Sequence, residues 1–242
     1  EQGADGGWTP LHAASYAGAA GAARVLIEGG ASLEAKGEGG ARPLRVAVDR
    51  DQEHVIDVLV AGGSDPDRYE PDGDSLLHRA AQGGRHHAAR ALIRGGGDPD
   101  IARADGERAL HRAVFLKYPG FVEVLLDEGA NIEAVNDQGS TPLHWAASLD
   151  HAEIAQLLLD RGALNSSRDR RQSTPLHVAI QHGNFRVLRI LLSADAEVEA
   201  KNRDGVTALW QASFGGDANS ARLLIESGAD VNAINRNGMT PL

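Results

Sequence analysis

The stretch TPLHWA at residues 141–146, followed by IAQLLLDRGA at 154–163, decides the fold because related stretches return along the chain. The related openings lie 33 residues apart, at TPLHAA (9–14), RPLRVA (42–47), SLLHRA (75–80), RALHRA (108–113), TPLHVA (174–179) and TALWQA (207–212). A final TPL at 240–242 begins another copy. A fixed period in this range indicates a repeat architecture, in which each unit packs against its neighbours.

Each unit predicts two short helices and a turn. Thr141 can accept a hydrogen bond from a free N–H at a helix start, and Pro142 suits the first helical position. Ile154, Leu157 and Leu158 recur at helical spacing, which predicts a half-buried second helix. A glycine then stands where a left-handed cap is needed. Helices of about 8–10 residues are too short to persist alone, so each must bury its face against the next repeat.

The period, the TPLHxAA opening, the LLL-x-x-GA segment and DVNA at 230–233 resemble the ankyrin repeat family. The resemblance covers nearly the whole chain. It implies an all-α repeat solenoid, an ankyrin array of stacked helix-turn-helix units with projecting β-hairpin fingers. It also implies that the motif histidines (His12, His78, His111, His144 and His177) bond to the motif threonine and to the adjacent loop.

We expect one array over residues 1–242. Its repeats fall at approximately 1–35, 36–68, 69–101, 102–134, 135–167, 168–200 and 201–233, with a partial repeat at 234–242. Because the sequence starts without Met and stops inside a motif, we expect it to be a piece of a longer chain.

Some copies depart from the pattern at positions that matter for stability. Arg42 and Arg108 replace the capping hydroxyl, and Arg45 replaces the motif histidine of the second repeat. Asp195 stands where other repeats place the glycine after the second helix, and Gln172 replaces a glycine of the finger. A left-handed backbone costs a residue other than glycine roughly 1–2 kcal/mol.

Composition and motifs argue against several classes of protein. The net charge is −10 and cysteine is absent, which disfavours a phosphate-backbone binder and excludes thiolate chemistry. Nucleic acid is therefore an unlikely partner, and no apolar run is long enough to span a membrane. The sequence contains no nucleophile-elbow motif, no Walker loop, no dinucleotide-binding motif and no zinc ligands at characteristic spacing. We predict no catalytic residue, no metal, no cofactor and no enzymatic activity.

Candidate binding residues stand four and seven positions after the start of each motif. In the family these positions point toward the concave groove formed by the first helices. Large or charged side chains there are poorly explained by packing, because Leu and Ala columns fill the core; they are Tyr16, Arg79, Arg112, Phe115, Trp145, Gln211 and Phe214. Arg79, Arg112, Phe115 and Trp145 come from consecutive repeats, so we expect them side by side. Arg170 and Arg171 add a basic finger.

These features predict a non-catalytic protein–protein interaction module, a scaffold that binds a partner through the concave inner-helix face and the fingers. The expected partner is another protein or peptide, an acidic segment with an apolar anchor, bound by a monomer. One alternative is the recognition or regulatory arm of a larger multidomain enzyme whose catalytic domain lies outside this chain. A structural spacer and an engineered binding scaffold are further alternatives. The cytoplasm is the default compartment, since no signal peptide or transmembrane segment is evident.

Overall fold

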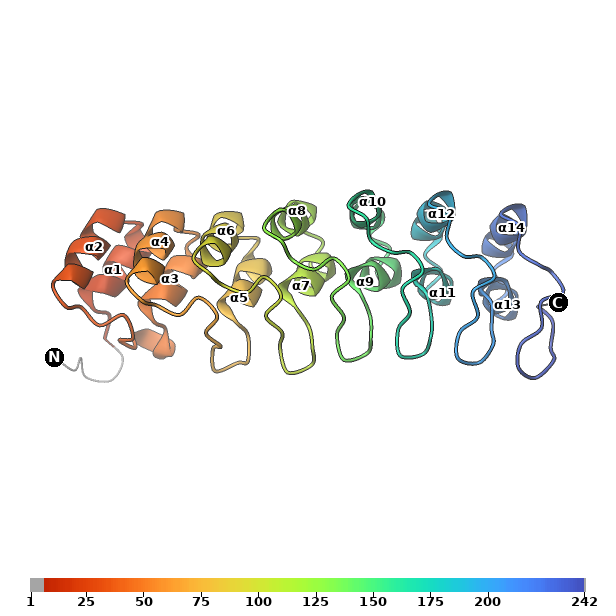
Figure 1. The fold of residues 1–242 in the computed structure, drawn as a ribbon, viewed down its shortest axis with the longest axis horizontal. Coiled ribbons are helices and arrows are strands. Elements are labelled where there is room, and N and C mark those ends of the chain that lie inside the picture. Colours follow the sequence, from red (N-terminus) through yellow and green to blue (C-terminus); the bar gives the residue numbers. More distant parts are fainter. Residues whose placement is uncertain (1–6, 242) are drawn as a thin grey trace. The chain divides into compact units, whose positions relative to one another are not determined.

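A computed structural model describes residues 7–241. These residues form fourteen α-helices and one short 3₁₀-helix, which confirms the predicted all-α repeat fold (Figure 1). The helices are α1 (Pro10–Ala17), α2 (Ala20–Glu28), η1 (Glu38–Gly40), α3 (Pro43–Asp49), α4 (Glu53–Ala61), α5 (Leu76–Gly83), α6 (His86–Arg94), α7 (Ala109–Phe115), α8 (Pro119–Asp127), α9 (Pro142–Ser148), α10 (Ala152–Asp160), α11 (Pro175–Gln181), α12 (Phe185–Ser193), α13 (Ala208–Phe214) and α14 (Ala218–Glu226). Residues 1–6 of the first expected repeat and Leu242 of the partial repeat lie outside the described residues.

The chain divides into two compact units. Unit 1 holds the described residues up to Ala104 together with Arg108–Ala113 and Gly120–Asn131, and unit 2 holds Asp105–Glu107, Val114–Pro119 and the described residues from Ile132 onward. In unit 1, α1, α3 and α5 pack in one row and α2, α4 and α6 in a second. In unit 2, α9, α11 and α13 form the inner row and α10, α12 and α14 the outer row (Figure 1).

The core of each unit is a thin aliphatic layer. Leu143, Ile154, Leu158 and the equivalent residues of other repeats are almost completely buried. Phe121 is the one aromatic side chain among the largest fully buried residues. The other aromatic rings of the described residues therefore do not belong to the fully buried core.

The motif histidine links the start of one inner helix to the next finger. In the fifth repeat the backbone N–H of Thr141 donates to Nδ1 of His144 (3.2 Å), so the ring proton stands on Nε2. Nε2 then donates to the carbonyl of Ser173 at 3.0 Å. His12 and His177 make the equivalent bonds to Ala41 and Val206. These contacts confirm the role that the family resemblance implied.

The fingers are tight turns and not regular hairpins. Backbone pairing amounts to isolated bridges at Tyr69–Ser75 and Ala102–Arg108, and the described residues contain no longer strand. In the finger of residues 167–174 the Asp169 N–H donates to the Ser173 carbonyl (3.0 Å), and the Gln172 N–H donates to the Asp169 carbonyl (2.8 Å). The expected β-hairpin is thus reduced to its turn, because these bonds close the turn at Asp169 and no ladder continues beyond it.

The predicted left-handed residues are observed. Asp195 has φ 56° and Gln172 has φ 59°, whereas the glycines of the equivalent helix ends have φ between 87° (Gly30) and 104° (Gly63). Arg42 makes no side-chain cap, as expected, and pairs instead with Glu34 at 2.9 Å. The departures therefore leave the helix boundaries intact and change only local stability.

Replacing Asp195 by glycine tests this backbone cost. Asp51 has the same φ of 56°, but its carboxylate accepts the N–H of Ala88 at the start of α6 (2.7 Å). We expect Asp195→Gly to raise the free energy of unfolding by about 0.5–1 kcal/mol, after the greater flexibility of glycine in the unfolded chain is subtracted. Asp51→Gly should instead lower it by about 1 kcal/mol, because the cap is lost. Chemical denaturation measures both, and equal effects of the two substitutions would contradict the assignment.

The buried histidines predict a loss of stability in acid. Burial lowers the pKa of His144 and of His177 from the ordinary value. The unfolded chain consequently binds more protons than the folded chain below about pH 6.5, and the contribution of these residues is lost as the pH falls below that value. Denaturation midpoints should be lower at acidic than at neutral pH, and NMR titration should place the pKa of both rings below the ordinary value of histidine, about 6.5. Titration of His144 and His177 at or above that value would refute the prediction.

Candidate partner-binding surface

The predicted groove positions of unit 2 carry an aromatic pair from two neighbouring repeats. Phe115 at the end of α7 and Trp145 on α9 approach with ring centroids 5.8 Å apart and planes at 73°. This edge-to-face geometry is favourable for aromatic rings. Phe115 is 49% exposed, and Trp145 is half-buried. Of the four residues expected to lie side by side, Phe115 and Trp145 are in contact, whereas Arg79 and Arg112 belong to unit 1.

A second aromatic pair occupies the last repeat. Trp210 and Phe214 on α13 stack with centroids 5.2 Å apart and planes at 11°. Phe214 is 82% exposed, more than any other large apolar side chain of residues 7–241, and Gln211 on the same helix is half-buried. Sequence reasoning named Phe214 and Gln211 but missed Trp210. The signal was present, because Trp210 stands in the slot that histidine fills in TPLHWA.

In unit 1 the predicted binding residue Tyr16 contacts an aromatic ring and a guanidinium group. Its ring lies 5.3 Å from that of Trp8, and the guanidinium of Arg50 lies 4.3 Å from the ring centroid. A cation over an aromatic face is attracted to its negative centre. Tyr16 and Trp8 are both exposed and form an apolar surface. The positive charge of Arg50 lies over the Tyr16 ring of this surface.

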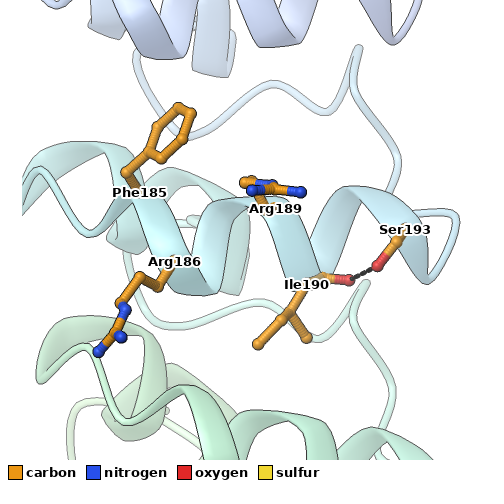
Figure 2. A pocket seen from close by; sticks show the side chains of 5 residues that line it. All are labelled: Phe185, Arg186, Arg189, Ile190 and Ser193. Carbon is orange, nitrogen blue, oxygen red and sulfur yellow. Dashed lines mark hydrogen bonds between the residues drawn. The ribbon is translucent and has the colours of Figure 1, made fainter.

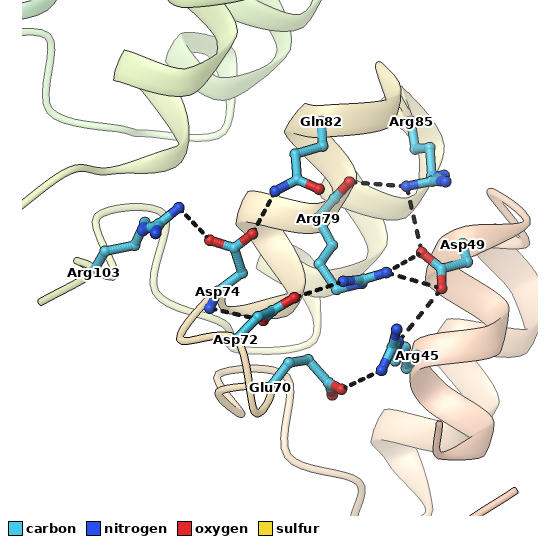
Figure 3. Close-up of polar contacts among 9 residues, drawn as sticks. All are labelled: Arg45, Asp49, Glu70, Asp72, Asp74, Arg79, Gln82, Arg85 and Arg103. Atoms are coloured by element: carbon cyan, nitrogen blue, oxygen red, sulfur yellow. Dashed lines mark hydrogen bonds and ion pairs between the residues drawn. The ribbon is translucent and has the colours of Figure 1, made fainter. Parts of the chain in front are cut away.

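Arg79 is not the free groove cation that sequence reasoning expected. Its side chain is 16% exposed and pairs with Asp49 at 3.4 Å and with Asp72 at 3.2 Å (Figure 3). Asp49 stands in the groove slot of the preceding repeat, seven residues after the start of its motif. Since both partners are intramolecular, a ligand would have to displace a carboxylate to reach the Arg79 guanidinium.

The same network explains the lost histidine of the second repeat. Arg45 occupies that slot and pairs at 3.0 Å with Glu70, whose side chain is 1% exposed. The carboxylate of Asp49 also pairs with the guanidinium of Arg85 (3.5 Å), and the carboxylate of Asp74 pairs with the guanidinium of Arg103 (2.6 Å) (Figure 3). A buried carboxylate needs such partners, because an unpaired one would be strongly destabilising. The network is a structural substitute for the histidine bond.

Three predicted residues remain: Arg112, Arg170 and Arg171. Arg112 is half-buried on α7 and belongs to unit 1. Arg170 and Arg171 are exposed on the finger of residues 167–174. The carboxylate of Asp169 accepts the N–H of Arg171 (2.8 Å), which fixes the turn that presents both arginines.

A further hollow lies on the outer helix α12, where sequence reasoning proposed nothing. It encloses about 320 Å³ and is lined by Phe185, Arg186, Arg189, Ile190 and Ser193. In Figure 2 Phe185 and Arg186 point to opposite sides of the helix, and the Ser193 hydroxyl donates to the Ile190 carbonyl (2.8 Å). These side chains diverge and do not converge on a ligand position.

The described residues contain no group of three His, Cys, Asp or Glu side chains placed to hold a metal ion. None of the described helices is long and apolar enough to cross a membrane. The carboxylates of Asp67 and Asp217 have shifted pKa values, and both lie in turns or caps. Burial raises the pKa of Asp67, and a hydrogen bond from Ser220 lowers that of Asp217 at the start of α14.

Family models for ankyrin repeats match most of the chain. The three-copy model matches residues 44–136 and 117–202, and the single-repeat model matches 6–38 and 204–236. No curated protein sequence matches the chain significantly. Among solved structures, the ankyrin repeat domain of Bcl-3, described as a unique member of the IkappaB protein family, is 28% identical with a TM-score of 0.75. The match covers 98% of this chain and 93% of that one. The chain belongs to the ankyrin repeat family.

Proposed function

We propose that this ankyrin array is a non-catalytic module that binds a protein partner through aromatic anchors in its groove. The observation that carries the proposal is the placement of the aromatic rings. The core is aliphatic, whereas Phe115, Trp145, Trp210 and Phe214 stand on the inner-helix side of unit 2, with Phe214 82% exposed. Exposed aromatic clusters on a soluble domain mark interaction surfaces.

The two aromatic pairs would accept apolar side chains of a partner. Trp and Tyr dominate interface hot spots because they bury large rigid surfaces at little entropic cost. The helices beneath them are fixed by the histidine bonds and by repeat packing, so the surface is formed before binding and little ordering is required. An apolar anchor flanked by acidic residues fits this surface, with Arg170 and Arg171 as the basic groups of the same unit. Arg79 and Arg112 belong to unit 1, where Asp49 and Asp72 already neutralise Arg79.

The double variant Phe115→Ala/Trp145→Ala tests the groove. Tyr118→Ala/Phe185→Ala is a matched control, since it removes two exposed rings of unit 2 that lie outside the groove. Partners captured by the wild-type array are quantified on both variants, and their affinities are then measured by calorimetry. We expect the groove variant to lose about 2 kcal/mol of binding free energy or more, roughly 30-fold in affinity, and the control to change little.

Circular dichroism and melting curves show whether both variants remain folded. Equal affinity of the groove variant and the wild-type chain would refute the groove as the binding site. An equal loss of affinity in the control variant would show that exposed apolar area contributes to binding wherever it lies on unit 2, and this would also contradict the proposal.

A further inference from the structure

One finger position carries arginine in three consecutive repeats. Arg170, Arg203 and Arg236 are spaced 33 residues apart and occupy the same place in the fingers of residues 167–174, 200–207 and 233–240. We call these three residues the arginine column. The equivalent position in the preceding finger is Asp137, so the column is confined to the last three fingers.

Backbone hydrogen bonds fix the column in register. The N–H of Arg170 donates to the carbonyl of Gln138 (2.9 Å), that of Arg203 to Arg171 (2.8 Å) and that of Arg236 to Asp204 (3.3 Å). Gly205, at φ 73°, makes the close approach possible, because a Cβ there would lie 2.9 Å from the Arg236 nitrogen. The three Cα positions are therefore set by the fold and not by the side chains.

The column is positively charged and available. All three arginines are exposed, and among the described residues none of them forms an ion pair. Arg168, by contrast, pairs with Glu197 at 3.4 Å. Asp169, the acidic neighbour of Arg170, directs a carboxylate oxygen to the backbone N–H groups of Arg171 and Ser173, both at 2.8 Å. Asp204 adds one exposed negative charge beside Arg203, so the fingertips remain basic in a chain of net charge −10.

An open hollow lies beside the column. It has a volume of about 610 Å³ and is lined by Lys201, Arg203, Ile234 and Arg236 among others. The Lys201 ammonium donates to the Ile234 carbonyl at 3.0 Å, which ties the two fingers together. Ile234 is 52% exposed. The hollow is thus lined by the guanidinium groups of Arg203 and Arg236 and by the aliphatic side chain of Ile234.

We propose that the arginine column binds an extended acidic segment of a protein, with carboxylates at every third residue and an aliphatic side chain against Ile234. The spacing follows from geometry. Helices of adjacent repeats pack about 8–10 Å apart, and an extended chain advances about 3.3 Å per residue, so three residues span one repeat. The inference rests on the proposed function in taking the partner to be a protein, and it shares Arg170 with that surface.

Nucleic acid fits this surface less well. Double-stranded DNA carries one negative charge per about 1.7 Å, far denser than one arginine per repeat. Single strands are held by base stacking on aromatic rings, and residues 167–174, 200–207 and 233–240 contain none. The net charge of −10 also repels a dense polyanion more than a short acidic peptide.

Two synthetic peptides of identical composition test the spacing. Each has about twelve residues with capped ends, four glutamates and one leucine; one places glutamate at every third residue, which the extended chain geometry favours, and the other places all four together. Binding to the full chain is measured by fluorescence anisotropy at low ionic strength, because salt screens exposed charges. We expect the spaced peptide to bind more tightly.

Two triple variants test the residues. Arg170→Gln/Arg203→Gln/Arg236→Gln removes the column, and Arg186→Gln/Arg189→Gln/Arg222→Gln removes the same charge from exposed positions on α12 and α14. The column variant should lose affinity for the spaced peptide about tenfold, the combined effect of three exposed ion pairs. The outer-helix variant should keep affinity within about threefold, because charges on α12 and α14 make no ion pair with a peptide bound at the fingertips and act on it only over a longer distance.

Equal losses in the two triple variants, equal binding of the two peptides, or no binding to the wild-type chain would each overturn the proposal. Tighter binding of a single-stranded oligonucleotide of equal charge, lost in the column variant, would assign the surface to nucleic acid instead. The Phe115→Ala/Trp145→Ala variant separates the two proposals, because it should lose captured partners while still binding the spaced peptide.

Discussion

The bond from the motif histidine to the carbonyl 29 residues later is the interaction on which the rest of the structure depends. It joins the start of an inner helix to the base of the next finger, as between His144 and Ser173 (3.0 Å). Short helices have no stability of their own, and this bond fixes how the next repeat is placed. The spacing of groove positions and of fingers within each unit follows from it.

Two repeats lose this histidine, with different results. In the second repeat Arg45 reaches the buried carboxylate of Glu70, and a network of ion pairs takes over the connection. In the last repeat Trp210 fills the slot and stacks on Phe214 of the same helix, and its indole N–H has no hydrogen-bond partner among the described residues, so the bond is not replaced there. Both changes alter the surface. The first neutralises Arg79, and the second places a half-buried ring beside the exposed ring of Phe214.

Much of this architecture could be predicted from the sequence because its rules are local. The hydroxyl caps, the prolines of the first turn and the left-handed positions at Gln172 and Asp195 depend on neighbouring residues along the chain. The charged contacts could not be predicted in the same way. Arg79 pairs with Asp49, 30 residues earlier, and with Asp72, 7 residues earlier, and only the folded geometry shows that both carboxylates reach it. The 33-residue period also predicts the arginine column, but only when equivalent finger positions of successive repeats are compared, in addition to equivalent helix positions.

The fingertip hydrogen bonds have a further consequence for how such a chain can vary in length. Within unit 2 each fingertip N–H donates to the preceding fingertip, from Asp137 to Asp105 (3.0 Å) through to Arg236 and Asp204 (3.3 Å). Adding or removing one residue in a finger would shift the donors of that finger away from their acceptors. The turns between the two helices of a repeat are tied to a neighbouring repeat as well, as by the Asn184 amide that donates to the Ala147 carbonyl (2.7 Å). The constant repeat length is therefore enforced at both ends of each helix pair, at the fingertips and at the helix–helix turns.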